Sequence, residues 1–292
     1  MLVERSPEGG NDVVFTYGRN LRYHSPEYIV SMVKELQTRY AVDFVTFLDE
    51  NLMTMEASSG RKWIGQICNE WDRAGLNPRV PNSTGGVYWS GTSHAGLHRP
   101  DVLRRMYDSG CTHLVYGLES FDPAILKRLG KGTNRENNIA SVGICLESGI
   151  VPIPNIIIGF PEETFDSIRN TITALLQLGI HAKPHFATAY PGSEWYYSYK
   201  EDILGQYAGN FEAYILDLGD ATKITATISR NFTGMELLGL QEIVAKRDIR
   251  LLDLAQKAWK GREALTAPQE SFNFRAKRQP GPLESIPVVM AA

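Results

Sequence analysis

The residues of this sequence that could hold a charged ligand lie in four short clusters. They are Asp49, Glu50 and Asn51, then Glu119 and Ser120, then residues 159–163 (GFPEE), and finally residues 190–193 (YPGS). Converging carboxylates suit a ligand ammonium group or the hydroxyls of a ribose. Each cluster alone is a weak signal, because polar residues end most strands and a Pro-Gly pair is usually just a turn.

The third cluster belongs to a longer pattern. Asn155, Ile157, Gly159 and Glu162 follow the motif GxIxGxxE apart from its first position, on a segment that we expect to be a strand. The other clusters also follow predicted strands, so coincidence is the weaker explanation for the four together.

The strands that must position these clusters are short apolar runs rich in Val, Ile, Thr and Phe. We predict them at residues 44–48, 112–117 and 153–158, with a last one inside residues 180–190. Amphipathic helices separate them. Ser25 and Pro26 begin the first helix, which ends near Tyr40, and others are predicted at residues 63–71, 100–108, 133–149 and 164–178.

This alternation of strands and helices implies parallel pairing, because each crossover helix must cover the sheet. Five such units are present, and residues 13–17 could add a first strand. We therefore expect an α/β fold, a partial (β/α)6 TIM-like barrel with parallel strands, plus a C-terminal helix and a loose tail. In such barrels the ligand lies at the carboxyl ends of the strands, where all four clusters fall.

The chain divides into three parts by composition. We assign residues 1–232 to the partial barrel, 233–264 to a helical extension with one long charged helix over 234–260, and 265–292 to a flexible tail with several prolines. Residues 77–98 are rich in Gly, Ser, Asn and Pro, and predict only a weak strand near 79–83 and a long loop. An aromatic run at residues 195–199 either lines a substrate mouth or, as we favour, packs a closing helix.

Bulk composition excludes several classes of protein. Lys and Arg number 30 against 33 Asp and Glu, with no long run of like charges, so a nucleic-acid partner is not implied. No apolar run approaches the roughly 20 residues of a membrane span, and we expect a cytoplasmic protein. Cys68, Cys111 and Cys145 are spaced too widely for a metal or disulfide framework, so buried free thiols are expected.

Several blocks occur in an order and spacing that resemble the radical S-adenosylmethionine (SAM) superfamily, particularly its members that often carry an upstream cobalamin-binding domain. The match spans roughly residues 17–260. The blocks are residues 22–27 (RYHSPE), 47–52 (FLDENL), 110–120 (GCTHLVYGLES), 126–133 (LKRLGKGT), 157–164 (IIGFPEET) and 190–193 (YPGS).

The resemblance implies a role for each cluster. It implies that Asp49, Glu50 and Asn51 bind the amino group of the methionine part of SAM, that Glu119 and Ser120 face its ribose, and that Ile157, Gly159 and Tyr190 lie near adenine. For adenine, an apolar side chain and close backbone approach are what the chemistry needs, and Ile157 with Gly159 supply both. In this family a reduced [4Fe-4S] cluster cleaves SAM to a 5′-deoxyadenosyl radical, which the barrel shields from water.

One family feature is missing from the sequence. The cluster is held by a CxxxCxxC loop after the first strand, and residues 1–15 contain no cysteine and no histidine. Either the chain is a fragment, as we favour because the loss is confined to one end, or it is a relative that binds no cluster. Cobalamin would then come through a missing upstream domain, and that domain or a partner could supply the cluster loop.

Three functions follow from these observations. The first is a radical SAM enzyme, or a fragment of one, that acts on an unknown small molecule or peptide by radical or methyl-transfer chemistry. The second is a cluster-free SAM-binding or scaffold module. The third is an unrelated α/β-barrel hydrolase or lyase that uses Asp49, Glu50 and Glu119 around a divalent metal, although the six histidines show no metal-ligand spacing.

Overall fold

The computed structural model of the 292-residue chain describes residues 2–5, 13–16, 23–49, 51–54, 56, 62–81, 85–97, 99–218 and 223–263. Glu50 and the predicted tail at 265–292 lie outside the described residues.

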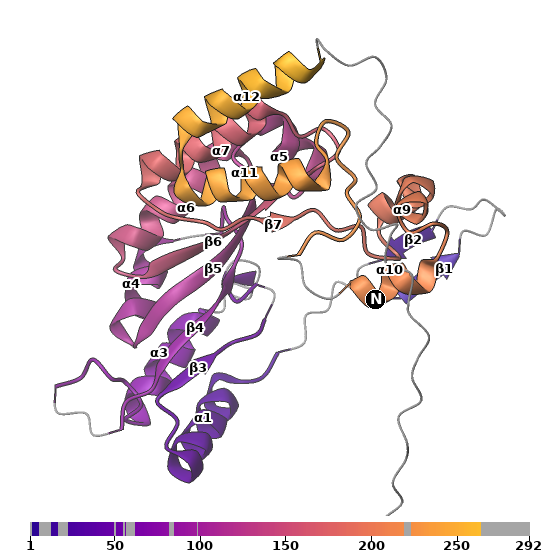
Figure 1. Cartoon of the computed structure of the whole chain (residues 1–292). Coiled ribbons are helices and arrows are strands. Elements are labelled where there is room, and N and C mark those ends of the chain that lie inside the picture. The colour runs from indigo at the N-terminus through magenta and orange to yellow at the C-terminus, as the bar shows by residue number, and fades with distance from the viewer. Residues whose placement is uncertain are drawn as a thin grey trace, which may run out of the picture.

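The centre of the fold is a sheet of five parallel strands in the order β3-β4-β5-β6-β7 (Figure 1). The strands are β3 (Phe44–Thr46), β4 (Tyr88–Ser93), β5 (Cys111–Glu119), β6 (Val151–Ile158) and β7 (His185–Phe186). Sequential order with parallel pairing is the arrangement of an opened TIM-like barrel. The predicted α/β partial barrel is confirmed.

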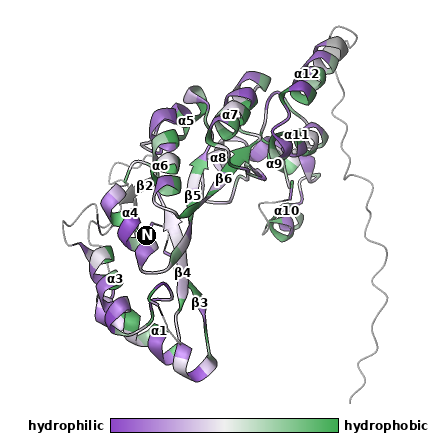
Figure 2. Ribbon diagram, turned by 90° about the vertical axis from the view of Figure 1, so that its left-hand side faces the viewer, coloured by the Kyte–Doolittle hydropathy of each residue, from purple (hydrophilic) through white to green (hydrophobic). Residues whose placement is uncertain are grey.

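Helices cover one face of this sheet (Figure 1). They are α1 (Pro26–Tyr40), α3 (Trp63–Arg73), α4 (Pro100–Asp108), α5 (Pro123–Leu129), α6 (Arg135–Glu147) and α7 (Phe165–Leu178). Ser25 caps α1 by accepting the Tyr28 N–H at 3.2 Å, as predicted. Helices α1, α3 and α4 carry both purple and green residues in Figure 2, as expected for helices with one apolar side.

Burial alternates along the two central strands. Leu114, Tyr116 and Ile156 are fully buried under the helices, whereas Gly117 and Ile153 lie on the other side and stay partly exposed. We call this second side the open face of the sheet.

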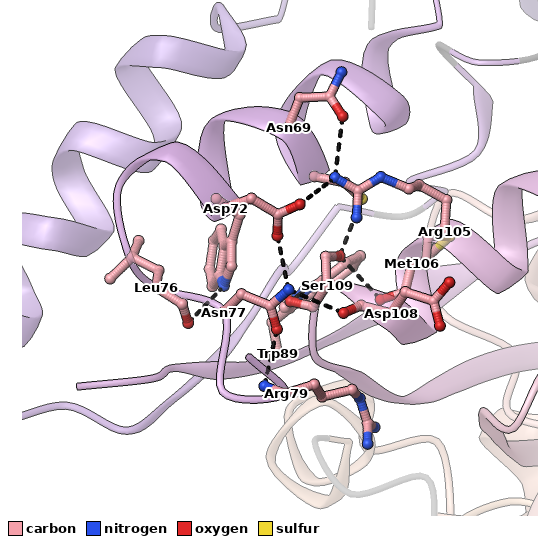
Figure 3. A network of polar contacts seen from close by, with 12 residues as sticks. Asn69, Asp72, Leu76, Asn77, Arg79, Trp89, Arg105, Met106, Asp108 and Ser109 are labelled. Carbon is pink, nitrogen blue, oxygen red and sulfur yellow. Dashed lines mark hydrogen bonds and ion pairs between the residues drawn. The ribbon is translucent and has the colours of Figure 1, made fainter. Parts of the chain in front are cut away.

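The structure corrects the strand that we predicted near residues 79–83. The second strand of the sheet is β4, Tyr88–Ser93, and residues 77–81 form a turn. Asn77 Nδ2 donates to Asp72 Oδ1 at 2.7 Å and to the Asp108 carbonyl at 3.0 Å (Figure 3). Arg79 Nε donates to the Tyr107 carbonyl at 2.7 Å. Polar side chains therefore fix this segment to the end of α4, a tertiary effect that local propensity does not contain.

The predicted single helix at 234–260 is also wrong in detail. The chain forms α11 (Gly234–Lys246) and α12 (Ile249–Glu263), with a break at Arg247, whose φ is 54°. Both helices join the main core through Leu237, Val244 and Leu252. Side chains of α12 thereby cover α7, as the Arg169–Asp253 ion pair at 2.7 Å shows.

Of the predicted strand at residues 13–17, the described residues 13–16 do not extend the parallel sheet, and residue 17 lies outside the described residues. Strand β2 (Val13–Thr16) instead pairs antiparallel with β1 (Leu2–Arg5) in a separate sheet of two strands. The family expectation of a first barrel strand at this position is therefore not met within the described residues.

Three short helices follow β7 and build a second apolar cluster. They are α8 (Glu194–Ser198), α9 (Lys200–Gln206) and α10 (Phe211–Asp217). Tyr196 and Tyr214 are buried there with stacked rings, 6.2 Å apart, and Trp195 meets Phe160 edge-on. Packing is thus the main role of this aromatic run, although Tyr197 remains exposed. None of the described helices is long and apolar enough to cross a membrane.

Candidate functional site

The carboxyl ends of the strands meet at one edge of the sheet, which we call the rim. Parallel pairing places the ends of β3, β5, β6 and β7 there, with Glu119 opposite Ile156 and Ile158 opposite Phe186. Asp49, Glu119, Gly159 and Tyr190 all follow the carboxyl end of a strand at this edge. The structure therefore brings the described part of the four clusters to the same end of the sheet.

Asp49 sits in a loop that is fastened to β4. Its carbonyl accepts a hydrogen bond from the Thr92 hydroxyl, and the Leu52 N–H donates to the Thr92 carbonyl at 3.0 Å. Asn51 uses its side-chain oxygen inside the same loop, where it accepts the Met53 N–H at 3.2 Å. The Asp49 side chain is left exposed to solvent. Of the first cluster, Asp49 is therefore the described residue with a carboxylate available to a ligand.

Glu119 ends β5 with a left-handed backbone, φ 60°, which a residue other than glycine adopts at a cost of about 1 kcal/mol. Its carboxylate pairs with Lys131, and Lys131 Nζ also donates to the Gly117 carbonyl at 2.9 Å. A Cβ at Gly117 would fall 2.5 Å from Lys131 Nζ. The ion pair therefore lies directly over Gly117 on the open face, in the space that glycine leaves free.

Lys131 is the site residue that our sequence reasoning did not select. Its block, LKRLGKGT, was matched without a role for any of its residues. Gly130 and Gly132 flank Lys131 with left-handed backbones, and His94 Nε2 contacts the Lys131 carbonyl at 3.2 Å. The loop is thus folded so that an ammonium group reaches the rim. The sequence signal that could have selected Lys131 is its position between two glycines.

Ser120 lies behind the rim. Its side chain is buried, accepts the Asp122 N–H at 3.0 Å, and contacts the Thr171 hydroxyl of α7 at 3.4 Å. Asn138 also donates to the Ser120 carbonyl at 3.1 Å. These contacts direct the hydroxyl toward the helix layer, so within the second cluster Glu119 is the group with a side chain on the open face.

The end of β6 offers an apolar edge and a close backbone. Ile157 is partly exposed on the open face, and Gly159 follows it with φ 89°. A Cβ at Gly159 would meet Leu237 of α11 at 3.0 Å, so the turn has room only for glycine without a shift of that side chain. Gly159 itself is buried, so the partly exposed Ile157 is the residue of this pair that a flat ring could contact.

A buried carboxyl supports that turn from below. Glu163 is 2% exposed and accepts hydrogen bonds from the backbone of Gly159 and Phe160 and from the Ser167 hydroxyl. Burial raises the pKa of Glu163 to about 7, against the lowering effect of these hydrogen bonds. Our motif match selected Glu162, which is instead exposed, with one oxygen 3.9 Å from Arg128. A spacing pattern does not show which of two adjacent glutamates turns inward.

Tyr190 follows β7 and is 45% exposed. The residues around it are fixed, because the Tyr214 hydroxyl donates to the Ala189 carbonyl and Ser193 caps α8. The Tyr190 ring is therefore available at the rim on a rigid segment.

The three cysteine thiols do not form a site for an iron-sulfur cluster. Cys68, Cys111 and Cys145 are all buried and free. Burial raises the pKa of Cys68 and Cys145 to about 11, and that of Cys111 well above its ordinary value, which disfavours the thiolate that a metal needs. Within the described residues, no three His, Cys, Asp or Glu side chains are grouped closely enough to hold a metal ion. These residues therefore do not fit an iron-sulfur cluster.

The rim combines groups that a zwitterionic nucleoside would use. The exposed carboxylate of Asp49 suits an ammonium group, the Glu119 carboxylate can accept from hydroxyls, and the edge at Ile157 and Gly159 suits a base. Lys131 adds a cation that suits a carboxylate.

The chain is similar in sequence to curated proteins that are named as methyltransferases. The chain is 26% identical over 190 residues to an uncharacterized methyltransferase of Pyrococcus horikoshii, which covers 64% of the chain and 38% of that protein. It is 26% identical over 193 residues to the bacteriochlorophyllide d C-12(1)-methyltransferase of Chlorobaculum tepidum, covering 64% of the chain and 39% of that protein. The chain thus spans less than half the length of these curated relatives.

Among solved structures, the chain is similar to the radical SAM methyltransferase TsrM of Kitasatospora setae, with cobalamin and a [4Fe-4S] cluster bound. Identity is 16%, coverage is 56% of this chain and 30% of that one, and the TM-score is 0.43. The family model of the radical SAM superfamily matches residues 9–175, more than half of the chain. This protein therefore belongs to the radical SAM superfamily.

Proposed function

We propose that this chain is the SAM-binding half-barrel of a radical SAM methyltransferase. The observation that carries the proposal is the meeting of Asp49, the Glu119–Lys131 pair and the Ile157–Gly159 edge at one rim of a parallel sheet. The curated relatives named as methyltransferases support methyl transfer as the reaction.

Each rim residue has a task in this proposal. Asp49 would bind the ammonium group of SAM, with Glu50 next to it in the sequence and Asn51 holding the loop. Glu119 would define the ribose position, and Ser120 would fix the backbone behind it. Lys131 would hold the Glu119 carboxylate toward the open face and balance its charge. Ile157, Gly159 and Tyr190 would enclose adenine and keep water from it. SAM, when bound, supplies an activated methyl or adenosyl group.

Ligands for an iron-sulfur cluster would come from outside the described residues, and cobalamin from a further domain. The substrate would be a small molecule or a peptide that reaches the open face. Because the described thiols do not fit a cluster, a second function deserves a test: a SAM-binding module that takes up no iron.

The test of SAM binding is calorimetric titration of the chain with SAM, and with S-adenosylhomocysteine as the product. We expect one site per chain. Asp49→Ala should weaken binding about tenfold or more, because a hydrogen bond to a charged group contributes about 1.5–3 kcal/mol. Lys131→Met should also weaken it, because the Glu119 carboxylate would lose the partner that holds it toward the open face. Glu147→Gln, an exposed change at the end of α6 and away from the rim, is the matched control and should leave the affinity unchanged. Equal affinity in all these variants would contradict the proposed site.

The iron content of the chain after reconstitution distinguishes the two candidate functions. Anaerobic reconstitution with iron and sulfide should give the visible absorption of a [4Fe-4S] cluster if the chain, or the chain with a partner domain, supports radical chemistry. SAM binding by a chain that stays colourless with every such partner would favour the cluster-free module.

A further inference from the structure

A groove opens at the amino end of the sheet, opposite the rim. Strands β6 and β7 pair only through Ile157 with His185 and Ile158 with Phe186. Before these pairs, β6 and the segment that leads into β7 diverge, and a cavity of about 580 Å³ lies between them. This volume is within the roughly 300–1,000 Å³ of small-molecule sites.

The walls of this groove are apolar side chains that are exposed to solvent. Val151 is 55% exposed, Ile153 is 41% exposed, and Leu146 at the end of α6 is 43% exposed. Ile180, which follows α7 in the chain, also lines the groove. Apolar side chains gathered in a concavity favour an apolar occupant, because burying them removes their surface from water.

The ionisable side chains that line the groove are all basic. Lys183, His181 and His185 line it, and its lining contains no Asp or Glu. Arg247 lies behind His181, with its guanidinium Nη2 2.5 Å from His181 Nε2. The groove is therefore apolar, with the ammonium group of Lys183 at its edge and no charge of the opposite sign among its lining residues.

His185 provides the most specific feature. Its Nδ1 is buried and has no hydrogen-bond partner among the described residues. A buried ring nitrogen without a partner is costly, and a turn of the His185 ring toward the groove would let an Nδ1–H donate to an acceptor oxygen of a ligand there. The Asn155 side chain lines the same space and offers a second polar contact.

We propose that this groove binds a small apolar carboxylic acid, with its hydrocarbon part on Val151 and Ile153 and its carboxylate toward Lys183 and His185. Charge complementarity selects the anion, since the lining carries the Lys183 ammonium group and no acid. The site is separate from the SAM rim, because it lies at the other end of the strands. It does not depend on the proposed function of that rim.

Titration of the full chain with octanoate tests the site. Octanol and octylamine serve as probes of the same length, one without charge and one with the opposite charge. Octanoate should bind one per chain, octanol several-fold more weakly, and octylamine not measurably. Octanol that binds as tightly as octanoate, or octanoate that shows no saturable binding, would overturn the proposal.

Two variants locate the ligand. Lys183→Glu should weaken octanoate binding about tenfold by reversing the charge at the groove. His185→Phe keeps a ring of similar size and should weaken it about threefold to fivefold. Lys127→Glu, the same charge reversal on an exposed face of α5, is the control. Thermal unfolding confirms that each variant is folded.

Unchanged octanoate affinity in the folded Lys183→Glu and His185→Phe variants would place the ligand elsewhere and refute the site. SAM affinity is measured in parallel. If the chain binds octanoate but does not bind SAM, the result counts against the proposed function of the rim and not against the groove.

Discussion

Replacement of Glu163 by glutamine should change how the stability of this protein depends on pH. The carboxyl is buried beneath the turn at Gly159 and Phe160 and accepts hydrogen bonds from both backbone amides and from Ser167. Burial raises its pKa from the ordinary 4.5 to about 7. Glutamine has the shape of the protonated acid and does not titrate, so the substitution isolates the cost of ionising this group.

The sign and size follow from linkage. A carboxyl whose pKa is higher in the folded state stabilises the fold below its unfolded pKa, and this contribution is lost as pH rises through the folded pKa. At about 1.4 kcal/mol per pKa unit, the rise from 4.5 to about 7 corresponds to about 3 kcal/mol. The wild-type chain should therefore lose about 3 kcal/mol of unfolding free energy relative to Glu163→Gln between about pH 4.5 and pH 7.5.

Urea unfolding at several pH values from 5 to 8 measures this difference. Near pH 5 the two proteins should be similar, and at pH 8 the glutamine variant should be the more stable one. Glu162→Gln controls for the loss of a carboxylate, since Glu162 is exposed on the same loop. Parallel stability curves for wild type and Glu163→Gln across this range would refute the reasoning.

Three further changes have defined outcomes. Gly117→Ala places a methyl group 2.5 Å from Lys131 Nζ, so it should displace that ammonium group and reduce SAM affinity in calorimetry, by less than Lys131→Met does because the lysine side chain can move. Gly143→Ala, where an added Cβ meets nothing within 4 Å, should leave SAM affinity unchanged. An equal loss of SAM affinity in the Gly117→Ala and Gly143→Ala variants would contradict this account. Trp71→Phe removes an indole N–H that donates to the Leu76 and Val87 carbonyls, both at 3.1 Å. It should lower the free energy of unfolding in urea by about 2–4 kcal/mol, and a decrease below about 1 kcal/mol would argue against those hydrogen bonds. Ala41→Gly should raise stability by about 0.5 kcal/mol in the same assay, because Ala41 ends α1 with φ 54°, and destabilisation would show that the strain is absent.

Much of the architecture could be predicted from local patterns. Strand and helix alternation gave the parallel sheet, and Ser25 gave the start of α1, because periodicity and capping depend on residues close in sequence. The prediction failed at residues 79–83, where Asn77 and Arg79 bond to backbone groups some 30 residues away and hold a turn. It failed again at Arg247, where a left-handed residue breaks an otherwise continuous helical pattern.

The sequence by itself determined that Asp49, Glu119 and Gly159 would follow the carboxyl ends of parallel strands, since topology fixes which end of each strand faces the rim. Only the tertiary structure decided which side chains serve that rim. It placed Lys131 over Gly117, turned the Ser120 hydroxyl toward α7, and buried Glu163 rather than Glu162. The physical reason is that the direction of a loop side chain depends on packing and hydrogen bonds with distant segments, which spacing along the chain does not encode.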